Sequence, residues 1–254
     1  KAVNTFAHQT SNLVGYNGYT ANADDSLEDG NIKQLTFGLS MENDYYATNM
    51  QRHGVTQSYD LMYQGEFLTK INLSVPGIHN VYNSLAAITV ADYLGVPIKD
   101  IAENIAKFTG VHRRFELLGK PNGITVVDDF AHHPTELTST LETAMELGFN
   151  HVWAVFQPHT FSRTALLMDD FAKALKIPDT ASISAILPVR ETNTYNVYNT
   201  DLGKKVPGSV CLETFDEITD YIVKNAKKGD LVLTMGGGNV YMCANQIVKA
   251  LENK

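Results

Sequence analysis

Cysteine is scarce in this chain of 254 residues, and long apolar runs are missing. Only Cys211 and Cys243 are present and they have no paired spacing, which excludes a disulfide framework and a cysteine-based zinc site. We expect both thiols to be buried and reduced. No apolar run reaches the length of a membrane-spanning helix, and the first residues lack an apolar signal core. These absences predict a soluble, cytoplasmic protein without membrane insertion.

Positive charge is also in short supply. The chain has 20 Lys and Arg against 28 Asp and Glu, for a formal net charge of −8. So acidic a surface repels a phosphate backbone, which argues against nucleic acid as a partner. Small anionic substrates remain compatible, because a few clustered Arg and His residues are enough to define a local site. With 44% hydrophobic and 19% charged residues, the chain should form a packed core in one large domain or two ordinary ones.

Two glycine-rich phosphate-binding patterns are absent as well. The loop pattern GxxxxGK[ST] does not occur: Gly119-Lys120 is followed by Pro121, and Gly203-Lys204 also fails. The dinucleotide pattern GxGxxG does not follow the apolar run at 124–129, and the GGGN at 236–239 lacks its spacing. These absences argue against an NAD(P)-type oxidoreductase, the main alternative from another class.

The first part of the chain combines strands with two helices. Strand-like segments separated by turn residues occupy 34–39, 44–50, 55–63 and 67–75, which predicts an antiparallel meander. Residues 1–14 resemble the end of a helix. The spacing of apolar residues predicts a helix over 80–94, with Leu85, Ile88 and Ala91 facing the core, and a second helix runs from Pro97 to Thr109-Gly110.

The second part alternates strands with helices. The predicted strands are 124–129, 151–157, 180–189, 209–213 and 230–235, and the predicted helices are 134–147, 164–175, 216–226 and 239–252. This alternation is typical of βαβ units and predicts a mostly parallel, doubly wound sheet. Ligands bind such sheets beyond the carboxyl ends of the strands.

Chemically useful side chains gather at those strand ends. Asp128-Asp129 and His132-His133 follow the first strand, and His159 and Arg163 follow the second. Each has a structural alternative: carboxylates at a strand end often cap a helix, and Gly236–Gly238 can be a tight packing turn. Arg113-Arg114 can be a solvated pair. Adjacent histidines point to different sides of an extended chain, so one shared metal is not expected. The convergence still argues against an inert interaction domain.

Four motifs together resemble the Mur ligases, in order and spacing: GIHNVYNSLAAI (77–88), TGVHRRFELLG (109–119), VVDDFAHHPTE (126–136) and FQPHTFSRT (156–164). The resemblance covers essentially the whole chain. It implies an α/β protein whose three domains are a UDP-binding domain, a central ATPase domain and a C-terminal Rossmann-like domain. Residues 1–118 would be the back half of the ATPase domain, with antiparallel strands plus helices. Residues 119–254 would be the C-terminal domain with its mostly parallel sheet.

The resemblance also implies a reaction. FQPHTFSRT and PVRE (188–191) look most like the branch that joins L-alanine to UDP-N-acetylmuramate through an acyl phosphate, using ATP and Mg²⁺. ANADD (21–25) and TFG (36–38) also resemble the central domain of that branch. DDFAHHPTE fits equally the branch that recycles a murein tripeptide, which is the alternative. Because the phosphate loop and the expected metal ligands would lie upstream, we predict a fragment that is inactive alone and has no metal site of its own.

Site residues follow from the same motifs. Those implied at ATP are His79, Asn80, Asn83, Arg114, Asp129 and His132, with the asparagines at adenine, Arg114 at the phosphates and Asp129 at the ribose. Those implied at the substrate are His159, Arg163, Arg190 and Gly237, with Arg163 on the L-alanine carboxylate. His133 and Arg114 are the implied catalytic residues. Some relatives carry Arg where this chain has Thr160, so Arg163 or Arg190 must contribute more here.

Overall fold

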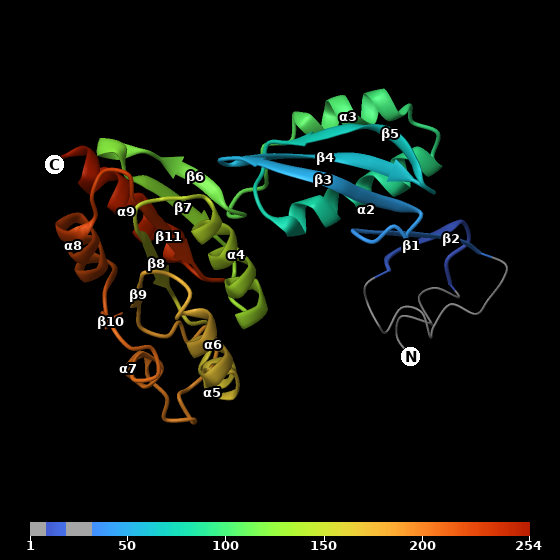
Figure 1. The fold of residues 1–254 in the computed structure, drawn as a ribbon. Coiled ribbons are helices and arrows are strands. Elements are labelled where there is room, and N and C mark those ends of the chain that lie inside the picture. The colour runs from blue at the N-terminus through green and yellow to red at the C-terminus, as the bar shows by residue number, and fades with distance from the viewer. Residues whose placement is uncertain (1–8, 19–31) are drawn as a thin grey trace. The chain divides into compact units, whose positions relative to one another are not determined.

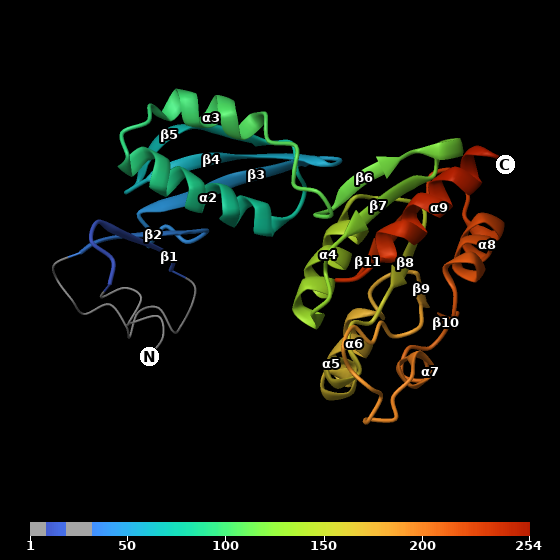
Figure 2. The ribbon, with the colours of Figure 1, turned by 180° about the vertical axis from the view of Figure 1, so that it is seen from behind.

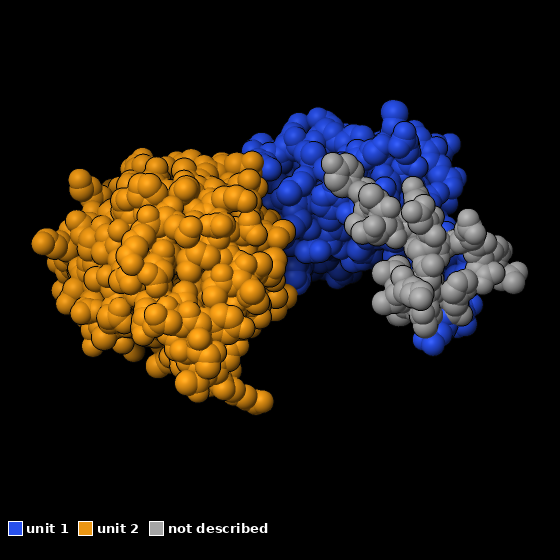
Figure 3. All heavy atoms as spheres, turned by 90° about the horizontal axis from the view of Figure 1, so that it is seen from below, with its two compact units in different colours: residues 1–109 blue, residues 110–254 orange. Residues whose placement is uncertain are grey.

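The structure is a computed structural model that describes residues 9–18 and 32–254. Its chain divides into two compact units, residues 1–109 and 110–254 (Figure 3). The sequence placed this division after residue 118. It lies earlier because β6 (Glu116–Gly119) pairs antiparallel with β7 (Thr125–Asp129), which makes the preceding segment part of unit 2. The ANADD segment at 21–25 lies outside the described residues.

Unit 1 contains a five-stranded sheet of order β1-β2-β3-β4-β5. Its strands are β1 (Leu13–Asn17), β2 (Lys33–Gly38), β3 (Tyr45–His53), β4 (Thr56–Tyr63) and β5 (Glu66–Leu73). The predicted antiparallel meander is right for β3, β4 and β5, but β1, β2 and β3 pair in parallel. The predicted helix end over 1–14 is wrong where it can be examined, because residues from Leu13 onward form β1. A short apolar run does not reveal its partner strand, and only the pairing with β2 distinguishes strand from helix.

Two helices, α2 (Ile78–Tyr93) and α3 (Ile98–Ala106), cover one face of this sheet (Figure 2). The predicted stripe on the first of them is confirmed: Leu85 and Ile88 are fully buried, and Ala91 packs against the same cluster. They pack with Tyr59 and Ile71 from the sheet. Helical spacing alone therefore identified the face of α2 that forms the core of unit 1.

Unit 2 contains a six-stranded sheet of order β10-β9-β8-β11-β7-β6 (Figure 1). The further strands are β8 (Val152–Phe156), β9 (Thr180–Ile183), β10 (Val210–Cys211) and β11 (Leu231–Met235). Every pairing is parallel except that of β6 with β7. The mostly parallel sheet predicted from the alternating pattern is therefore confirmed.

Helices cover both faces of the unit 2 sheet. They are α4 (Pro134–Glu146), α5 (Phe161–Leu166), α6 (Met168–Ala174), α7 (Asn199–Gly203), α8 (Phe215–Asn225) and α9 (Val240–Glu252), with a 3₁₀ turn at Pro121–Gly123. Along β8, Val152, Ala154 and Phe156 pack into the cluster formed with α4 and α6. Trp153 and Val155 point the other way, into the cluster formed with α8 and α9. A strand with two buried faces has no polar alternation, which explains its continuous apolar sequence.

Three details of unit 2 differ from the sequence prediction. The helix predicted over 164–175 is two helices that break at Leu167. The strand predicted over 180–189 ends at Ile183, and the following segment instead pairs with the loop after β8, where Leu187 N–H donates to Pro158 O at 2.9 Å. Cys243 is fully buried, where its pKa rises to about 12, but Cys211 is only half-buried. In the part of the chain that the structure describes, none of the helices has the length and apolar character needed to span a membrane.

Candidate functional site

β8 and β11 are neighbouring strands at the centre of the unit 2 sheet, and the chain segments that follow them turn to opposite faces of the sheet. The chain leaves β8 through α5 and α6 on one face, and leaves β11 through α9 on the other. Neighbouring strands whose connections part in this way leave a crevice at their carboxyl ends, which is where open α/β sheets bind ligands. Gln157, which follows β8, donates through Nε2 to Oδ1 of Asn239, which follows β11, at 2.9 Å. This bond joins the segments that follow the two strands.

The Gly236–Gly238 turn lies against that bond without room for side chains. A Cβ on Gly238 would overlap Leu187 and lie 2.7 Å from Gln157 Oε1. A Cβ on Gly237 would lie 3.1 Å from Cγ of His132. A side chain at either position would displace Leu187, Gln157 or His132, so glycine lets these neighbouring groups approach the backbone of the turn.

Arg113 and Asp128 form a buried ion pair beneath the turn. Their side chains are 12% and 1% exposed, and Arg113 Nε donates to Asp128 Oδ2 at 2.8 Å. Thr234 Oγ1 donates to the other oxygen of Asp128 at 2.6 Å. The alternative of a solvated arginine pair is wrong for Arg113, because its guanidinium bonds to protein groups instead of water. These partners are Asp128 on β7 and the carbonyl groups of Gly236 and Gly238, which lie over a hundred residues further along the chain. Local sequence carries no signal for such a pairing.

Arg114 and Asp129 differ sharply in accessibility. Arg114 is exposed, with its guanidinium 5.5 Å from the ring centroid of Phe130. Asp129 is 6% exposed and accepts from the backbone N–H groups of Phe115 and Ala131, each at 2.7 Å. Burial raises the pKa of Asp129, although these two hydrogen bonds act in the opposite direction. The carboxylate thus holds the backbone around Arg114, while the guanidinium itself is accessible to an anion.

The two adjacent histidines occupy different environments. His133 caps α4, with its side chain accepting from Thr135 N–H at 3.3 Å and its own N–H donating to Glu136. His132 instead has its Nδ1 2.9 Å from Phe130 O. Helix capping was the structural alternative for Asp128 and Asp129, and at α4 the capping residue is His133. Among residues 9–18 and 32–254, His, Cys, Asp and Glu form no cluster of three or more that would suit a metal ion.

His159 lies close to both His132 and Arg163. The ring centroids of His132 and His159 are 5.9 Å apart. Burial, followed by the nearby charges of Arg163 and His132, lowers the pKa of His159. His159 Nδ1 and Arg163 Nη1 are both buried and have no hydrogen-bond partner within the described chain. Buried polar atoms normally find partners, so these two are suited to meet a ligand.

Thr160 sets the direction of the short helix that carries Arg163. Its backbone has φ 68° and ψ 144°, a region that β-branched residues rarely adopt and that costs on the order of 1–3 kcal/mol. Thr160 N–H donates to Leu187 O at 2.9 Å, and its carbonyl accepts from Thr164 Oγ1 at 2.7 Å. Arg190 lies apart from this network, exposed on the turn from Pro188 to Glu191. The structure therefore brings His159 and Arg163 together and leaves Arg190 at the surface.

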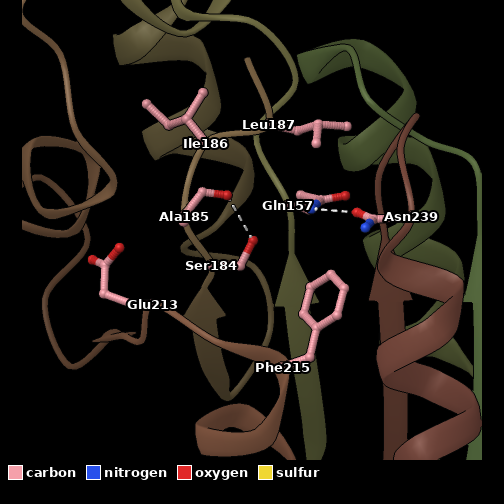
Figure 4. Close-up of a pocket in the computed structure, with 8 residues that line it drawn as sticks. All are labelled: Gln157, Ser184, Ala185, Ile186, Leu187, Glu213, Phe215 and Asn239. Carbon is pink, nitrogen blue, oxygen red and sulfur yellow. Dashed lines mark hydrogen bonds between the residues drawn. The ribbon is translucent and has the colours of Figure 1, made fainter. Parts of the chain in front are cut away.

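A cavity of about 190 Å³ opens at the carboxyl ends of β8 and β9 (Figure 4). Its lining residues are Gln157, Ser184, Ala185, Ile186, Leu187, Glu213, Phe215 and Asn239. Sequence reasoning did not name Ser184 or Glu213 as site residues, because the strands predicted over 180–189 and 209–213 contained them, whereas β9 ends at Ile183 and β10 at Cys211. The cavity shares Gln157 and Asn239 with the crevice.

In unit 1, the three expected adenine-binding residues share the first turns of α2. Asn80 Nδ2 donates to Pro76 O at 2.7 Å, and Asn83 Nδ2 donates to Asn80 Oδ1 at 3.3 Å. His79 Nε2 lies 3.2 Å from Asn80 Nδ2. Asn83 is exposed and Asn80 is half-buried, so the side-chain amides of both residues are accessible at this end of α2.

Comparisons with known proteins cover nearly all of the chain. The UDP-N-acetylmuramate–L-alanine ligase of Acetivibrio thermocellus is 39% identical over 250 residues, which span 93% of this chain and 53% of that protein. The chain thus spans about half the length of the curated relatives it matches. The solved UDP-N-acetylmuramate–alanine ligase of Thermotoga maritima has the same fold, with a TM-score of 0.76 and 23% identity over 98% of this chain and 62% of that one. A murein peptide ligase of Psychrobacter arcticus gives a TM-score of 0.66 and 26% identity over 100% of this chain and 55% of that one.

Two family models match successive parts of the sequence. The Mur ligase middle domain matches residues 7–91, and the Mur ligase glutamate ligase domain matches residues 113–238. The first covers most of unit 1 and the second most of unit 2. With its two-sheet architecture and these matches, the chain belongs to the Mur ligase family.

Proposed function

We propose that the chain is part of an ATP-dependent ligase that joins L-alanine to UDP-N-acetylmuramate. The observation that carries this proposal is the 39% identity to a UDP-N-acetylmuramate–L-alanine ligase across 93% of the chain. In the proposed reaction, the carboxylate of the nucleotide sugar takes the γ-phosphoryl group of ATP, which forms an acyl phosphate and releases ADP. The amine of L-alanine then attacks the acyl phosphate, forming the amide and releasing phosphate.

Each unit carries candidate groups for the nucleotide. Asn80 and Asn83 offer amide donors and acceptors that suit adenine, with His79 beside them. Arg114 would meet the phosphates, which its exposure supports, because a planar guanidinium matches phosphate oxygens. Asp129 has little exposed surface for a ribose, and its hydrogen bonds to Phe115 and Ala131 favour holding the backbone next to Arg114. His132 would lie between nucleotide and acceptor.

The acceptor end would use His159 and Arg163. The partnerless Arg163 Nη1 supports a role in pairing the L-alanine carboxylate. The attacking amine must be unprotonated, and a histidine whose pKa is lowered is neutral and able to accept a proton at neutral pH. Of the histidines here, His159 meets that condition better than His133, whose Nδ1 already accepts from the α4 backbone. Gly237 would contribute backbone, and Arg190 a peripheral charge.

A magnesium ion is implied by the chemistry of ATP, but the described residues offer no fitting site. They contain no group of three or more His, Cys, Asp or Glu placed to hold one, and the 254 residues contain no GxxxxGK[ST] loop for the phosphates. No step of the reaction is therefore assigned to a metal in this chain. Measured alone, the chain should release no phosphate from ATP with both substrates present.

The test is phosphate release by the full-length protein that carries this chain. It should be assayed with ATP, magnesium and UDP-N-acetylmuramate, adding either L-alanine or the murein tripeptide L-Ala-γ-D-Glu-meso-diaminopimelate. Release that depends on L-alanine supports the proposal. Release with the tripeptide alone would favour the recycling branch, the second candidate, for which the 26% identity to a murein peptide ligase is the specific observation. Silence with both acceptors would refute the two together.

A further inference from the structure

Arg113 has an arrangement that neither the resemblance nor the proposed reaction accounts for. Its guanidinium donates through three different nitrogens to three acceptors: Asp128 Oδ2 at 2.8 Å, Gly238 O at 2.8 Å and Gly236 O at 2.7 Å. The rings of Phe130 and Tyr241 each have their centroid 5.0 Å from its Cζ. All three acceptors of this planar fork therefore belong to the protein itself, and the Arg113 side chain is 12% exposed.

Two of these three acceptors are the carbonyl groups of the glycine turn. Glycine carries no side chain that packs, so the turn depends on its backbone bonds for a fixed shape. Gly236 N–H donates to Asp129 O at 3.2 Å, and Arg113 holds the carbonyl side of the same residue. The guanidinium therefore joins the end of β11 to the end of β7, where Asp128 lies.

The same residue also determines where its neighbour points. Arg113 and Phe115 have φ values of 58° and 49°, so the backbone bends on either side of Arg114. Arg113 N–H donates to Glu116 Oε2 at 2.8 Å, and Phe115 N–H donates to Asp129 Oδ2 at 2.7 Å. With Arg113 buried and its backbone held on both sides, Arg114 is directed outward.

We propose that Arg113 is a positioning residue, which fixes both the glycine turn and the outward orientation of Arg114. Arg113 touches no ligand itself. It acts through Arg114, the group assigned to the ATP phosphates, and through the backbone that Gly237 presents. The inference rests on the proposed function only for the identity of the ligands, because the bonds to the turn are independent of it.

The experiment compares Arg113→Ala and Arg113→Lys in the full-length protein. A lysine keeps the charge but cannot donate to three separated acceptors at once, so both variants should lower kcat/KM for ATP roughly 10- to 100-fold, the loss typical of a misplaced charged contact. Guanidinium ion at about 10 mM, far below denaturing concentrations, should restore activity to Arg113→Ala but leave Arg113→Lys unchanged. Lys173→Ala is the matched control, since it removes an exposed ion pair with Asp170 at 3.0 Å.

Hydrogen exchange supplies a readout that does not depend on catalysis. Amides of the segment around Gly236–Gly238 should exchange faster in both Arg113 variants than in the parent or in Lys173→Ala. Unchanged exchange at the turn would overturn the inference, as would faster exchange with unaltered ATP kinetics. If the parent protein itself releases no phosphate, the proposed function fails, and the exchange measurement still decides whether Arg113 holds the turn.

Discussion

The candidate residues of the two units are held in different ways. In unit 1, Asn80 and Asn83 are bonded to nearby backbone and to each other on one helix end, and Asn83 is exposed. In unit 2, Arg113 and Asp128 are buried in a network that joins segments over a hundred residues apart. Unit 1 therefore presents its polar groups on a surface that would fold without them. Unit 2 builds its site from the same bonds that hold the ends of its strands.

In unit 1, a site residue can therefore be changed with little effect on stability, whereas in unit 2 the buried residues of the site also stabilise the fold. A buried charge whose partner is removed is left without solvent or counter-charge, which destabilises the fold. An exposed amide that loses its partner can bond to water at little cost. Substitutions in the Arg113–Asp128 network of unit 2 should therefore change folding and catalysis together, and those at Asn80 or Asn83 in unit 1 should change ligand affinity alone.

The largest effect is expected for Asp128→Ala. This change leaves the Arg113 guanidinium buried without its carboxylate and should lower the free energy of unfolding by about 3–5 kcal/mol. The comparison in unit 1 is Glu103→Ala, which removes an exposed pair with Lys99 and should cost less than about 1 kcal/mol. Urea denaturation of both variants measures the difference. Equal losses would show that burial does not distinguish the two units.

Glycine substitutions should give the next largest effect. Gly238→Ala would overlap Leu187 and crowd Gln157, so we expect a loss of about 1–3 kcal/mol together with reduced activity. Gly54 lies in the hairpin between β3 and β4, and an alanine Cβ there would meet no atom within 4 Å. The strain of a positive φ of 62° is then the source of its destabilisation. Gly54→Ala should cost about 1 kcal/mol and leave kinetics unchanged. Thermal unfolding and steady-state rates test both, and a kinetic defect in Gly54→Ala would contradict the comparison.

Arg163→Met should separate function from stability inside unit 2. Because Arg163 Nη1 has no partner in the described chain, its removal should leave the unfolding free energy unchanged or slightly higher. The KM for L-alanine should rise roughly 10- to 100-fold, as expected for a lost charged hydrogen bond. Asn80→Ala in unit 1 should raise the KM for ATP only about threefold to tenfold. A marked loss of stability in Arg163→Met would mean that the residue is structural.

The smallest effect concerns pH. Because the folded pKa of His159 is lowered from 6.5, the unfolded chain binds its proton more readily. The associated stability should be complete above about pH 6.5 and should be lost as pH falls from there through the lowered folded pKa. His159→Gln should remove this part of the pH dependence. Denaturation of both proteins between pH 7.5 and 5 would check it, and parallel curves would assign the titration elsewhere.

Several features of the site could be predicted because they depend on position along a strand. Asp128 lies at the end of β7, and His132, His159 and Gly237 follow strands of the same sheet, in which parallel strands bring their carboxyl ends to one edge. The partners within the site could not be predicted in this way. His133, not a carboxylate, caps α4, and the cavity beside Ser184 and Glu213 was missed. Both depend on which side chains meet in space, which local pattern does not encode.

By itself, the sequence determined most of the elements, the alternation in unit 2 and the buried stripe of α2, because periodicity reflects the burial of each face. Tertiary structure decided that β1 is a strand, that β2 pairs with β3 in parallel, and that β6 belongs to unit 2. It also decided that Arg113 is buried while Arg114 is exposed. Two adjacent residues of one type are equivalent in sequence, and only long-range hydrogen bonds and burial give them opposite roles.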